Sequence, residues 1–338
     1  MSAAPDARPP SAAPGPRRVV SAVVGPTAAG KSALAMAVAE ACGAAIVSAD
    51  SRQLYRRFDI GTAKPSAVER ARVPHYGVDV AEPTERWSAA RWADACEGWV
   101  AECDARGTPP LLVGGTGLYL RVLSEPFFTE PPLDAGRRAA LHDVLGTLPV
   151  AELRRWVAVL DPTRAHLGPA QLLRAAEVAL LTGRRLSELH ARNVRAPRFA
   201  VRYLVVDPGP PLAERIDARV DAMLAAGWLA EVRALAARVA ADAPAWQASG
   251  YETWRAHLDG RLPFAAARER VVALTRQYAK RQRTWFRHQL GSAPVLRLNP
   301  DAPGAVDAAF AWWRAGQHGG RAANVAPHPP SAMREDAA

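Results

Sequence analysis

Two short segments near the N-terminus carry residue types that together could bind a phosphate chain and react with the group it carries. Gly25–Ser32 reads GPTAAGKS and fits the pattern G-x-x-x-x-G-K-[ST], directly after an apolar run. In such a loop, glycines let backbone N–H groups face an anion, Lys31 reaches the terminal phosphates, and the Ser32 hydroxyl suits Mg²⁺. The second segment, Asp50–Gln53, reads DSRQ and follows another apolar run. The first pattern predicts polyphosphate binding without saying which polyphosphate.

Asp50 is the acid best placed to take part in the chemistry. ATPases and kinases usually pair a phosphate loop with an apolar strand that ends in Asp. The apolar run Pro109–Val113 is followed by Gly-Gly-Thr-Gly instead, and at Asp207 the following Pro208 favours a surface turn. A carboxylate beside a bound diphosphate could act as a general base or as a magnesium partner, and Gln53 is suited to a base edge. The residues alone indicate a transferase that uses a diphosphate or triphosphate.

These residues need a scaffold that brings them together. Short apolar runs expected to be strands alternate with helical segments, which predicts a parallel, doubly wound α/β sheet. The expected strands are Val19–Val24, Ala44–Asp50, Pro109–Val113 and Arg202–Asp207. Because ligands bind beyond the carboxyl ends of parallel strands, the phosphate loop, Asp50 and the Gly114–Tyr119 segment should converge there. The predicted fold is a P-loop-type α/β sheet with a mainly helical insertion and a basic C-terminal helical segment.

Composition suggests where the domains begin and end. Residues 1–18 and 316–338 are rich in Pro, Ala and Gly and are predicted to be disordered tails. Residues 19–130 and about 200–300 should form the core, and residues 131–199 the helical insertion. Apolar runs all fall well short of the roughly 20 residues that cross a bilayer. Three cysteines without a C-x-x-C spacing predict neither disulfides nor a zinc site, and fit a monomer in the reducing cytoplasm.

The charge balance points to an anionic partner. The chain has 43 basic and 33 acidic residues, a net charge of +10, which favours nucleic acid as one candidate. Its last strong helical segment, residues 268–289, contains only one acid, Glu269. At 100° per residue, four cations of this segment share one face: Arg276, Lys280, Arg283 and Arg287. That face is predicted to bind an anion.

Four blocks in order resemble the tRNA dimethylallyltransferases, also called tRNA isopentenyltransferases: GPTAAGKS, then DSRQLY from Asp50, DIGTAKP from Asp59 and VGGTGLY from Val113. TRQYAKRQRTW, from Thr275, resembles a later block of the same family. The resemblance implies that the loop holds the diphosphate of dimethylallyl diphosphate. The dimethylallyl group would pass to N6 of the adenosine just 3′ of the anticodon, with release of diphosphate.

The resemblance also implies roles for individual residues. Asp50, Lys31, Ser32 and Arg276 would be catalytic, with Asp50 taking the proton of the amine and Arg276 on the diphosphate. The expected diphosphate-binding residues are Gly25, Pro26, Thr27, Ala28, Ala29, Gly30, Lys31 and Ser32. The expected tRNA-binding residues are Asp50, Ser51, Arg52, Gln53, Thr116, Gln171, Arg174, Lys280 and Arg283. The implied cofactor is Mg²⁺ on Ser32, and the implied partners are the anticodon stem-loop of tRNA and dimethylallyl diphosphate.

One stretch departs from the family pattern. His166–Arg174 is one residue shorter than expected, lacks the family's Asn-Asp, and has Gln171 where an arginine is expected. The prenyl-transfer residues are unaffected, so the departure predicts altered discrimination among tRNAs.

Three other functions remain open from the sequence. An adenylate isopentenyltransferase would keep the diphosphate loop and Asp50 but has little use for the cationic face of residues 268–289. A small-molecule kinase would need an acid such as Asp207 and would turn over ATP. A tRNA-binding protein without activity could retain the fold, but the intact Lys31, Ser32, Asp50 and Thr116 argue against it.

Overall fold

The computed structural model describes residues 17–128, 133–192 and 194–319. These residues divide into two compact units. The larger unit contains the described residues up to Ser124 and from Arg198 onward, and the smaller unit contains those between Glu125 and Pro197. None of the described helices is long and apolar enough to span a membrane.

The larger unit is built on a six-stranded sheet in which all neighbouring strands are parallel, in the order β3-β2-β4-β1-β7-β8. The strands are β1 Val19–Val24, β2 Ala45–Ser48, β3 His75–Tyr76, β4 Pro110–Gly114, β7 Ala200–Val206 and β8 Val295–Leu298. The residues of β2 and β4 are all buried, as expected for strands covered on both faces. The predicted doubly wound parallel sheet is confirmed.

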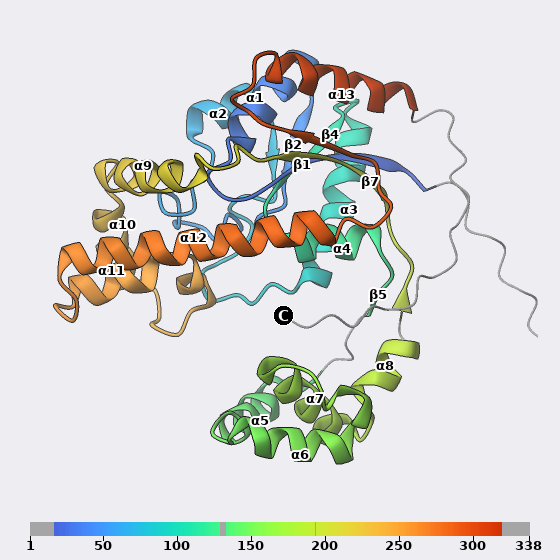
Figure 1. Cartoon of the computed structure of the whole chain (residues 1–338), viewed down its shortest axis with the longest axis vertical. Helices are drawn as coiled ribbons and strands as arrows, with labels where there is room; N and C mark the ends of the chain where they lie inside the picture. Colours follow the sequence, from blue (N-terminus) through green and yellow to red (C-terminus); the bar gives the residue numbers. More distant parts are fainter. Residues whose placement is uncertain (1–16, 129–132, 193, 320–338) are drawn as a thin grey trace, which may run out of the picture. The chain divides into compact units, whose positions relative to one another are not determined.

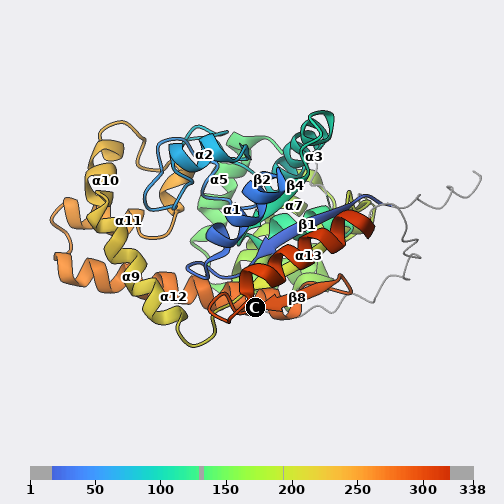
Figure 2. The same ribbon diagram turned by 90° about the horizontal axis from the view of Figure 1, so that it is seen from above.

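Helices cover both faces of this sheet (Figure 1). One face carries α1 (Lys31–Cys42) and α13 (Ala305–Gly319), and Figure 2 shows α13 lying along β1. The other face carries α3 (Ala89–Ala105) and α4 (Gly117–Ser124). This arrangement leaves the carboxyl ends of the central strands free to hold loops, which is where the sequence places its chemistry.

A group of helices extends the larger unit beyond the sheet. It comprises α9 (Leu212–Ala225), α10 (Trp228–Ala236), α11 (Tyr251–Leu258) and the 25-residue α12 (Phe264–His288), and the short α2 (Ala67–Arg72) follows the loop after β2. Trp228, Trp246, Tyr251 and Trp254 are almost completely buried and contact one another edge to face. This aromatic cluster fixes α10 and α11, while α9 packs along α12.

The smaller unit is mainly helical. It contains α5 (Ala135–Gly146), α6 (Val150–Leu160), α7 (Pro169–Thr182), α8 (Leu186–Arg192) and an antiparallel pair, β5 (Phe127–Phe128) with β6 (Val194–Arg195). Leucines and valines from α5, α6, α7 and α8 form its own hydrophobic core. Buried Asp161 links α6 to α8, since its carboxylate accepts hydrogen bonds from the backbone N–H and hydroxyl of Ser187.

Several elements were not foreseen from the sequence. β3 has two residues and β8 is largely exposed, so neither carries the apolar run that reveals a buried strand. α13 continues to Gly319, so the first four residues of the tail predicted at 316–338 are helical. The remainder of that tail, and residues 1–16 of the tail predicted at 1–18, lie outside the described residues.

Replacement of Gly98 by alanine should stabilise the protein. Gly98 is exposed in the interior of α3, and a Cβ added there would have no heavy atom within 4 Å. Alanine lowers the backbone entropy of the unfolded chain, so Gly98→Ala should add about 0.5 to 1 kcal/mol to the free energy of unfolding. Gly114→Ala is the opposite case, because its Cβ would lie 2.1 Å from the Ala49 carbonyl oxygen. Gly114→Ala should therefore lower the free energy of unfolding. Chemical denaturation of both variants measures these changes. A Gly114→Ala variant as stable as the wild type would contradict the close approach of the two backbones.

Candidate active site

A cavity of about 370 Å³ lies in the larger unit beyond the carboxyl ends of β1, β2 and β4. Residues of the phosphate loop, of the segment after β2 and of the loop after β4 all line it, together with side chains of α9 and α12. The cavity therefore collects the three polar segments that the sequence predicted would converge. Lys31, Ser32, Asp50 and Arg52 are among its lining residues.

The phosphate loop is held tightly against β7. Gly25 has φ +147°, and a Cβ there would lie 2.1 Å from the carbonyl oxygen of Val206, so only glycine fits. Lys31 Nζ donates a hydrogen bond to the carbonyl oxygen of Pro26 at 2.6 Å, across the loop. Burial and the neighbouring Arg219 lower the pKa of Lys31 to about 8, although Asp50 acts in the opposite direction. A buried positive charge of this kind favours an anionic ligand.

Asp50 is fixed by its own turn and by the loop after β4. Its Oδ1 accepts a hydrogen bond from the backbone N–H of Arg52 at 2.8 Å. On either side, the Ser51 N–H donates to Thr116 Oγ1 at 3.0 Å, and the Thr116 N–H donates to the Ala49 carbonyl at 3.1 Å. Thr116 therefore serves to hold the Asp50 segment, and the carboxylate faces the cavity from a rigid backbone.

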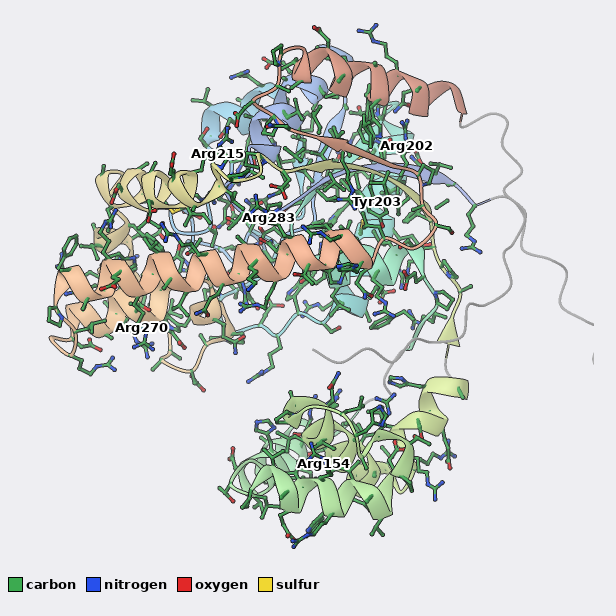
Figure 3. The ribbon with its side chains drawn as sticks, in the orientation of Figure 1. Arg154, Arg202, Tyr203, Arg215, Arg270 and Arg283 are labelled. Atoms are coloured by element: carbon green, nitrogen blue, oxygen red, sulfur yellow. The ribbon has the colours of Figure 1, made fainter. Side chains whose placement is uncertain are left out.

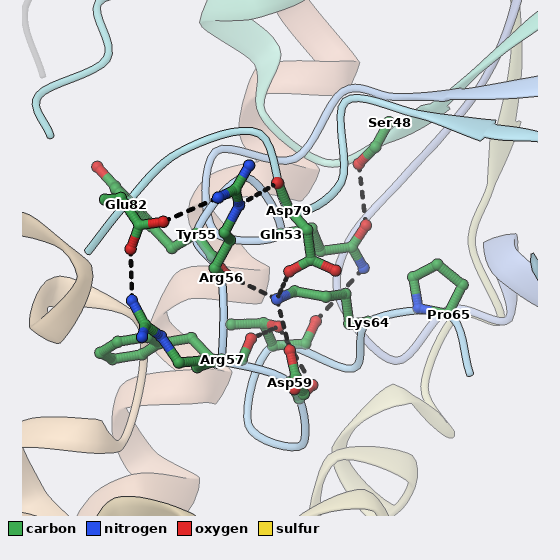
Figure 4. Close-up of polar contacts among 12 residues, drawn as sticks. Ser48, Gln53, Tyr55, Arg56, Arg57, Asp59, Lys64, Pro65, Asp79 and Glu82 are labelled. Carbon is green, nitrogen blue, oxygen red and sulfur yellow. Dashed lines mark hydrogen bonds and ion pairs between the residues drawn. The ribbon is translucent and has the colours of Figure 1, made fainter. Parts of the chain in front are cut away.

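Gln53 is engaged within the protein. Its Oε1 accepts a hydrogen bond from Ser48 Oγ at 2.9 Å, and its Nε2 donates to the Ala63 carbonyl at 2.9 Å (Figure 4). Its amide oxygen can accept a second hydrogen bond and Gln53 lines the cavity, so the contact with a nucleotide base stays a prediction. In the structure Gln53 joins β2 to the Asp59–Pro65 loop, which forms one wall of the cavity.

Lys64 is the buried centre of an ion network in the same wall. Its side chain is 1% exposed, and Nζ donates to Asp59 Oδ1 at 2.5 Å, Asp79 Oδ1 at 2.6 Å and the Tyr55 carbonyl at 2.6 Å (Figure 4). Arg70 also donates to Asp79. Burial alone would raise the pKa of Asp79, but hydrogen bonds from Lys64 and Arg70 outweigh it and lower that pKa.

Helices α10 and α11 support the loop from the other side. Glu231 Oε2 accepts hydrogen bonds from the backbone N–H groups of Asp59 and Ile60, at 3.0 and 2.8 Å. Tyr251 donates its hydroxyl proton to Glu231 and accepts from the Gly61 N–H. The DIGTAKP block is therefore a braced wall whose charged side chains are mostly paired within the protein.

Arg219 is an arginine of the cavity lining that was not predicted from the sequence. Arg219 lines the cavity from α9, whereas Arg276 on α12 forms an ion pair with Asp217 and is not among the lining residues. The signal in the sequence was its place on the buried face of α9, one residue before Val220. Burial lowers the pKa of Arg219, and nearby Asp50 opposes that shift.

The cations of α12 are only partly available to a ligand. Arg283 points toward the sheet, where its Nε donates to Asp207 Oδ2 at 2.9 Å (Figure 3). Asp207, expected in a surface turn, is thus half-buried, paired, and absent from the cavity lining. Lys280 and Arg287 are exposed. Of the four cations predicted to share one face, Arg276 and Arg283 thus pair with acids, Asp217 of α9 and Asp207 after β7.

The predicted tRNA-binding residues of the insertion lie in the smaller unit. Gln171 Oε1 accepts a hydrogen bond from the Gly168 N–H at 3.0 Å and so caps the start of α7. Arg174 donates to Glu177 at 3.5 Å, and this buried carboxylate also accepts from His142 at 2.6 Å and from Arg138.

Comparison with known protein families identifies the chain. The IPP transferase family model matches residues 53–289, more than half of the sequence, and an isopentenyl transferase model matches residues 18–73. The chain belongs to the IPP transferase family. Among IPP transferase relatives, the tRNA dimethylallyltransferase of Anaeromyxobacter sp. (strain Fw109-5) is 45% identical, over 80% of this chain and 91% of its own length. The tRNA dimethylallyltransferase of Synechococcus sp. (strain JA-3-3Ab) is 37% identical, over 96% of this chain and 95% of its own length.

Solved structures of IPP transferases have the same fold. The tRNA isopentenylpyrophosphate transferase of Bacillus halodurans superposes with a TM-score of 0.64 at 30% identity, covering 90% of this chain and 98% of its own. A eukaryotic dimethylallyltransferase acting on tRNA gives a TM-score of 0.69 at 26% identity, covering 83% and 74%. The match thus extends over most of the chain.

The Lys64 network should make stability depend on pH. The pKa of Asp79 is lower in the folded protein than in the unfolded chain. The ionised carboxylate therefore stabilises the fold at pH values above the ordinary pKa of Asp, and this stabilisation is lost as the pH falls through the lowered pKa of the folded state. Asp79→Asn should therefore lower the free energy of unfolding by about 2 kcal/mol at pH 7, and the gap should narrow below about pH 4. Urea denaturation across this range measures it. Glu82→Gln, which breaks exposed pairs to Arg56 and Arg57, is the control, and an equal loss there would contradict the buried network.

Proposed function

We propose that this chain transfers the dimethylallyl group of dimethylallyl diphosphate to N6 of the adenosine 3′-adjacent to the anticodon in tRNA. The observation that carries the proposal is that Lys31, Arg219 and Asp50 line a single cavity. In the reaction the bond between C1 of the donor and oxygen breaks, and its electron pair leaves with diphosphate. A bond forms between C1 and N6, and N6 loses a proton.

The phosphate loop supplies the charge that makes diphosphate a good leaving group. Lys31, Arg219 and the backbone N–H groups at the start of α1 would surround it with positive potential. The half-buried Lys31 is partly desolvated, and such interactions are stronger there than in bulk water. Arg219, rather than the predicted Arg276, is our candidate for the arginine on the diphosphate, because Arg219 lines the cavity and Arg276 is not among the lining residues.

Apolar side chains also line the cavity. Met36, Val220 and Met223 are among them, and none of these three can donate a hydrogen bond to phosphate. They suit the five-carbon hydrocarbon of the donor, whose burial there contributes about 25 cal/mol per Å². The cavity thus offers charged groups for the diphosphate and apolar side chains for the hydrocarbon of dimethylallyl diphosphate.

Asp50 is the candidate general base. The amino group of adenine is a weak nucleophile and gains from a group that accepts its proton as the bond to C1 forms. The rigid turn that holds Asp50 keeps its second oxygen available, because the only hydrogen bond recorded for its carboxylate in the described residues is to Oδ1. The target base must leave its stack to reach this depth.

Magnesium fits the donor set of the cavity. Ser32 and Asp50 offer oxygen atoms, which Mg²⁺ prefers, and no cluster of three or more His, Cys, Asp or Glu in the described residues could hold an ion by itself. We propose that Ser32 and the diphosphate oxygens hold Mg²⁺, which would neutralise charge on the leaving group.

The relatives favour tRNA over free AMP as the acceptor. Both relatives and the solved structures given above bear names that specify tRNA. We propose that exposed Lys280 and Arg287 of α12, with Gln171 and Arg174 of the smaller unit, contact the anticodon arm. A kinase is disfavoured because Asp207 is paired with Arg283 and lies outside the cavity lining.

Prenyl transfer to three acceptors tests the proposal. Labelled dimethylallyl diphosphate is offered with an unmodified anticodon stem-loop carrying adenosine 3′ of the anticodon, with the same loop changed at that base, and with free AMP. Label should enter the first stem-loop alone. Label on AMP would indicate an adenylate isopentenyltransferase instead. Absence of label from every acceptor at low salt would refute prenyl transfer.

Two arginine variants separate the roles of α9 and α12. Arg219→Ala should lower kcat/KM for dimethylallyl diphosphate by about 100-fold, because a charge-assisted contact to the leaving group is lost. Arg276→Ala should change it by less than about 3-fold, since Arg276 is exposed, pairs with Asp217 and is not among the residues that line the cavity. Steady-state kinetics with saturating stem-loop measure both values. A larger loss of kcat/KM in Arg276→Ala than in Arg219→Ala would indicate instead that Arg276 contacts the diphosphate.

A further inference from the structure

Helix α12 places one buried amide between the phosphate loop and the loop after β4. The side chain of Gln282 is almost fully buried. Its Oε1 accepts a hydrogen bond from the Thr27 N–H at 2.8 Å, and its Nε2 donates to the Gly115 carbonyl at 2.9 Å. Because the Thr27 N–H can only donate and the Gly115 carbonyl can only accept, these two partners define which way round the amide of Gln282 lies.

The approach at this point is close enough to exclude other side chains. A Cβ added to Gly115 would lie 2.2 Å from Gln282 Nε2 and 3.3 Å from the Gly25 carbonyl oxygen. Glycine at position 115 therefore lets Gln282 reach both loops. The next turn of α12 repeats the arrangement, since a Cβ on Gly117 would lie 2.2 Å from the indole of Trp285.

The two partners of Gln282 belong to opposite sides of the proposed reaction. Thr27 lies in the loop that would hold the leaving diphosphate. Gly115 precedes Thr116, whose backbone and side chain hold Ala49 and Ser51, the neighbours of Asp50. The amide of Gln282 thus links the diphosphate cradle to the loop after β4, and Thr116 of that loop holds the segment that carries Asp50.

We propose that Gln282 is a positioning residue that sets the separation between the diphosphate cradle and Asp50, an inference that rests on the function proposed above. A transfer reaction needs its reacting atoms about 3 to 3.5 Å apart, and an error near 1 Å costs about 100-fold in rate. Gln282 also occupies the Thr27 N–H, so that amide is not one of the donors that bind phosphate. Losing Gln282 therefore misaligns the reactants without removing a phosphate ligand.

This role predicts a particular kinetic pattern. In Gln282→Leu, kcat for prenyl transfer should fall at least about 10-fold, while KM for dimethylallyl diphosphate stays within about 2-fold. Gln282→Glu should behave similarly, because it keeps an acceptor for Thr27 but can no longer donate to Gly115. Gln277→Leu is the matched control: Gln277 is exposed on the same helix, and its loss should leave kcat unchanged within about 2-fold.

The experiment combines single-turnover kinetics with the stem-loop and calorimetric titration of inorganic diphosphate with Mg²⁺. The titration gives the fraction of each preparation that binds diphosphate, so rates are expressed per competent molecule and partial misfolding does not hide the result. Diphosphate affinity within about 2-fold of the wild type together with a lowered rate supports positioning. A rate within 2-fold of the wild type, or complete loss of diphosphate binding, overturns it. Failure of the wild type itself to prenylate the stem-loop would refute the proposed function instead.

Discussion

The start of the phosphate loop approaches the end of β7, and the end of β4 approaches the segment after β2, so closely that glycine is required at both points. A Cβ at Gly25 would lie 2.1 Å from the Val206 carbonyl, and one at Gly114 would lie 2.1 Å from the Ala49 carbonyl. These contacts between backbones leave little room for adjustment, so the sheet fixes the approximate positions of Lys31 and Asp50, and side chains such as Gln282 complete the geometry. The chemistry depends on that fixed geometry, because neither side chain needs a mobile loop to reach the cavity.

Most polar side chains around the cavity serve to hold this geometry. Lys64 and Glu231 fix the Asp59–Pro65 wall, and Gln53 joins it to β2. A buried polar or charged group without its partner lowers the stability of the fold, so each of these groups is bonded within the protein. Lys31 and Arg219 differ, since their positive charges face a cavity that an anion can enter.

The sequence predicted the scaffold well because its signals are local. A G-x-x-x-x-G-K-S loop between a strand and a helix, and buried apolar runs, define β1, α1 and the parallel sheet. Side-chain direction was harder to predict. Arg276 is drawn to Asp217, 59 residues away, and Arg219 reaches the cavity because α9 packs along α12. Edge strand β8 and the internal bonds of Gln53 likewise depend on tertiary neighbours that no local pattern records.

The most direct test of the account is a crystal structure with Mg²⁺ and a dimethylallyl diphosphate analogue in which sulfur replaces the oxygen on C1. The diphosphate oxygens should lie in the phosphate loop against the backbone N–H groups at the start of α1, in contact with Lys31 and Arg219. The hydrocarbon should lie beside Val220 and Met223, with C1 on the side of Asp50. A diphosphate bound at Arg276, or a reversed analogue with its hydrocarbon in the phosphate loop, would contradict the account.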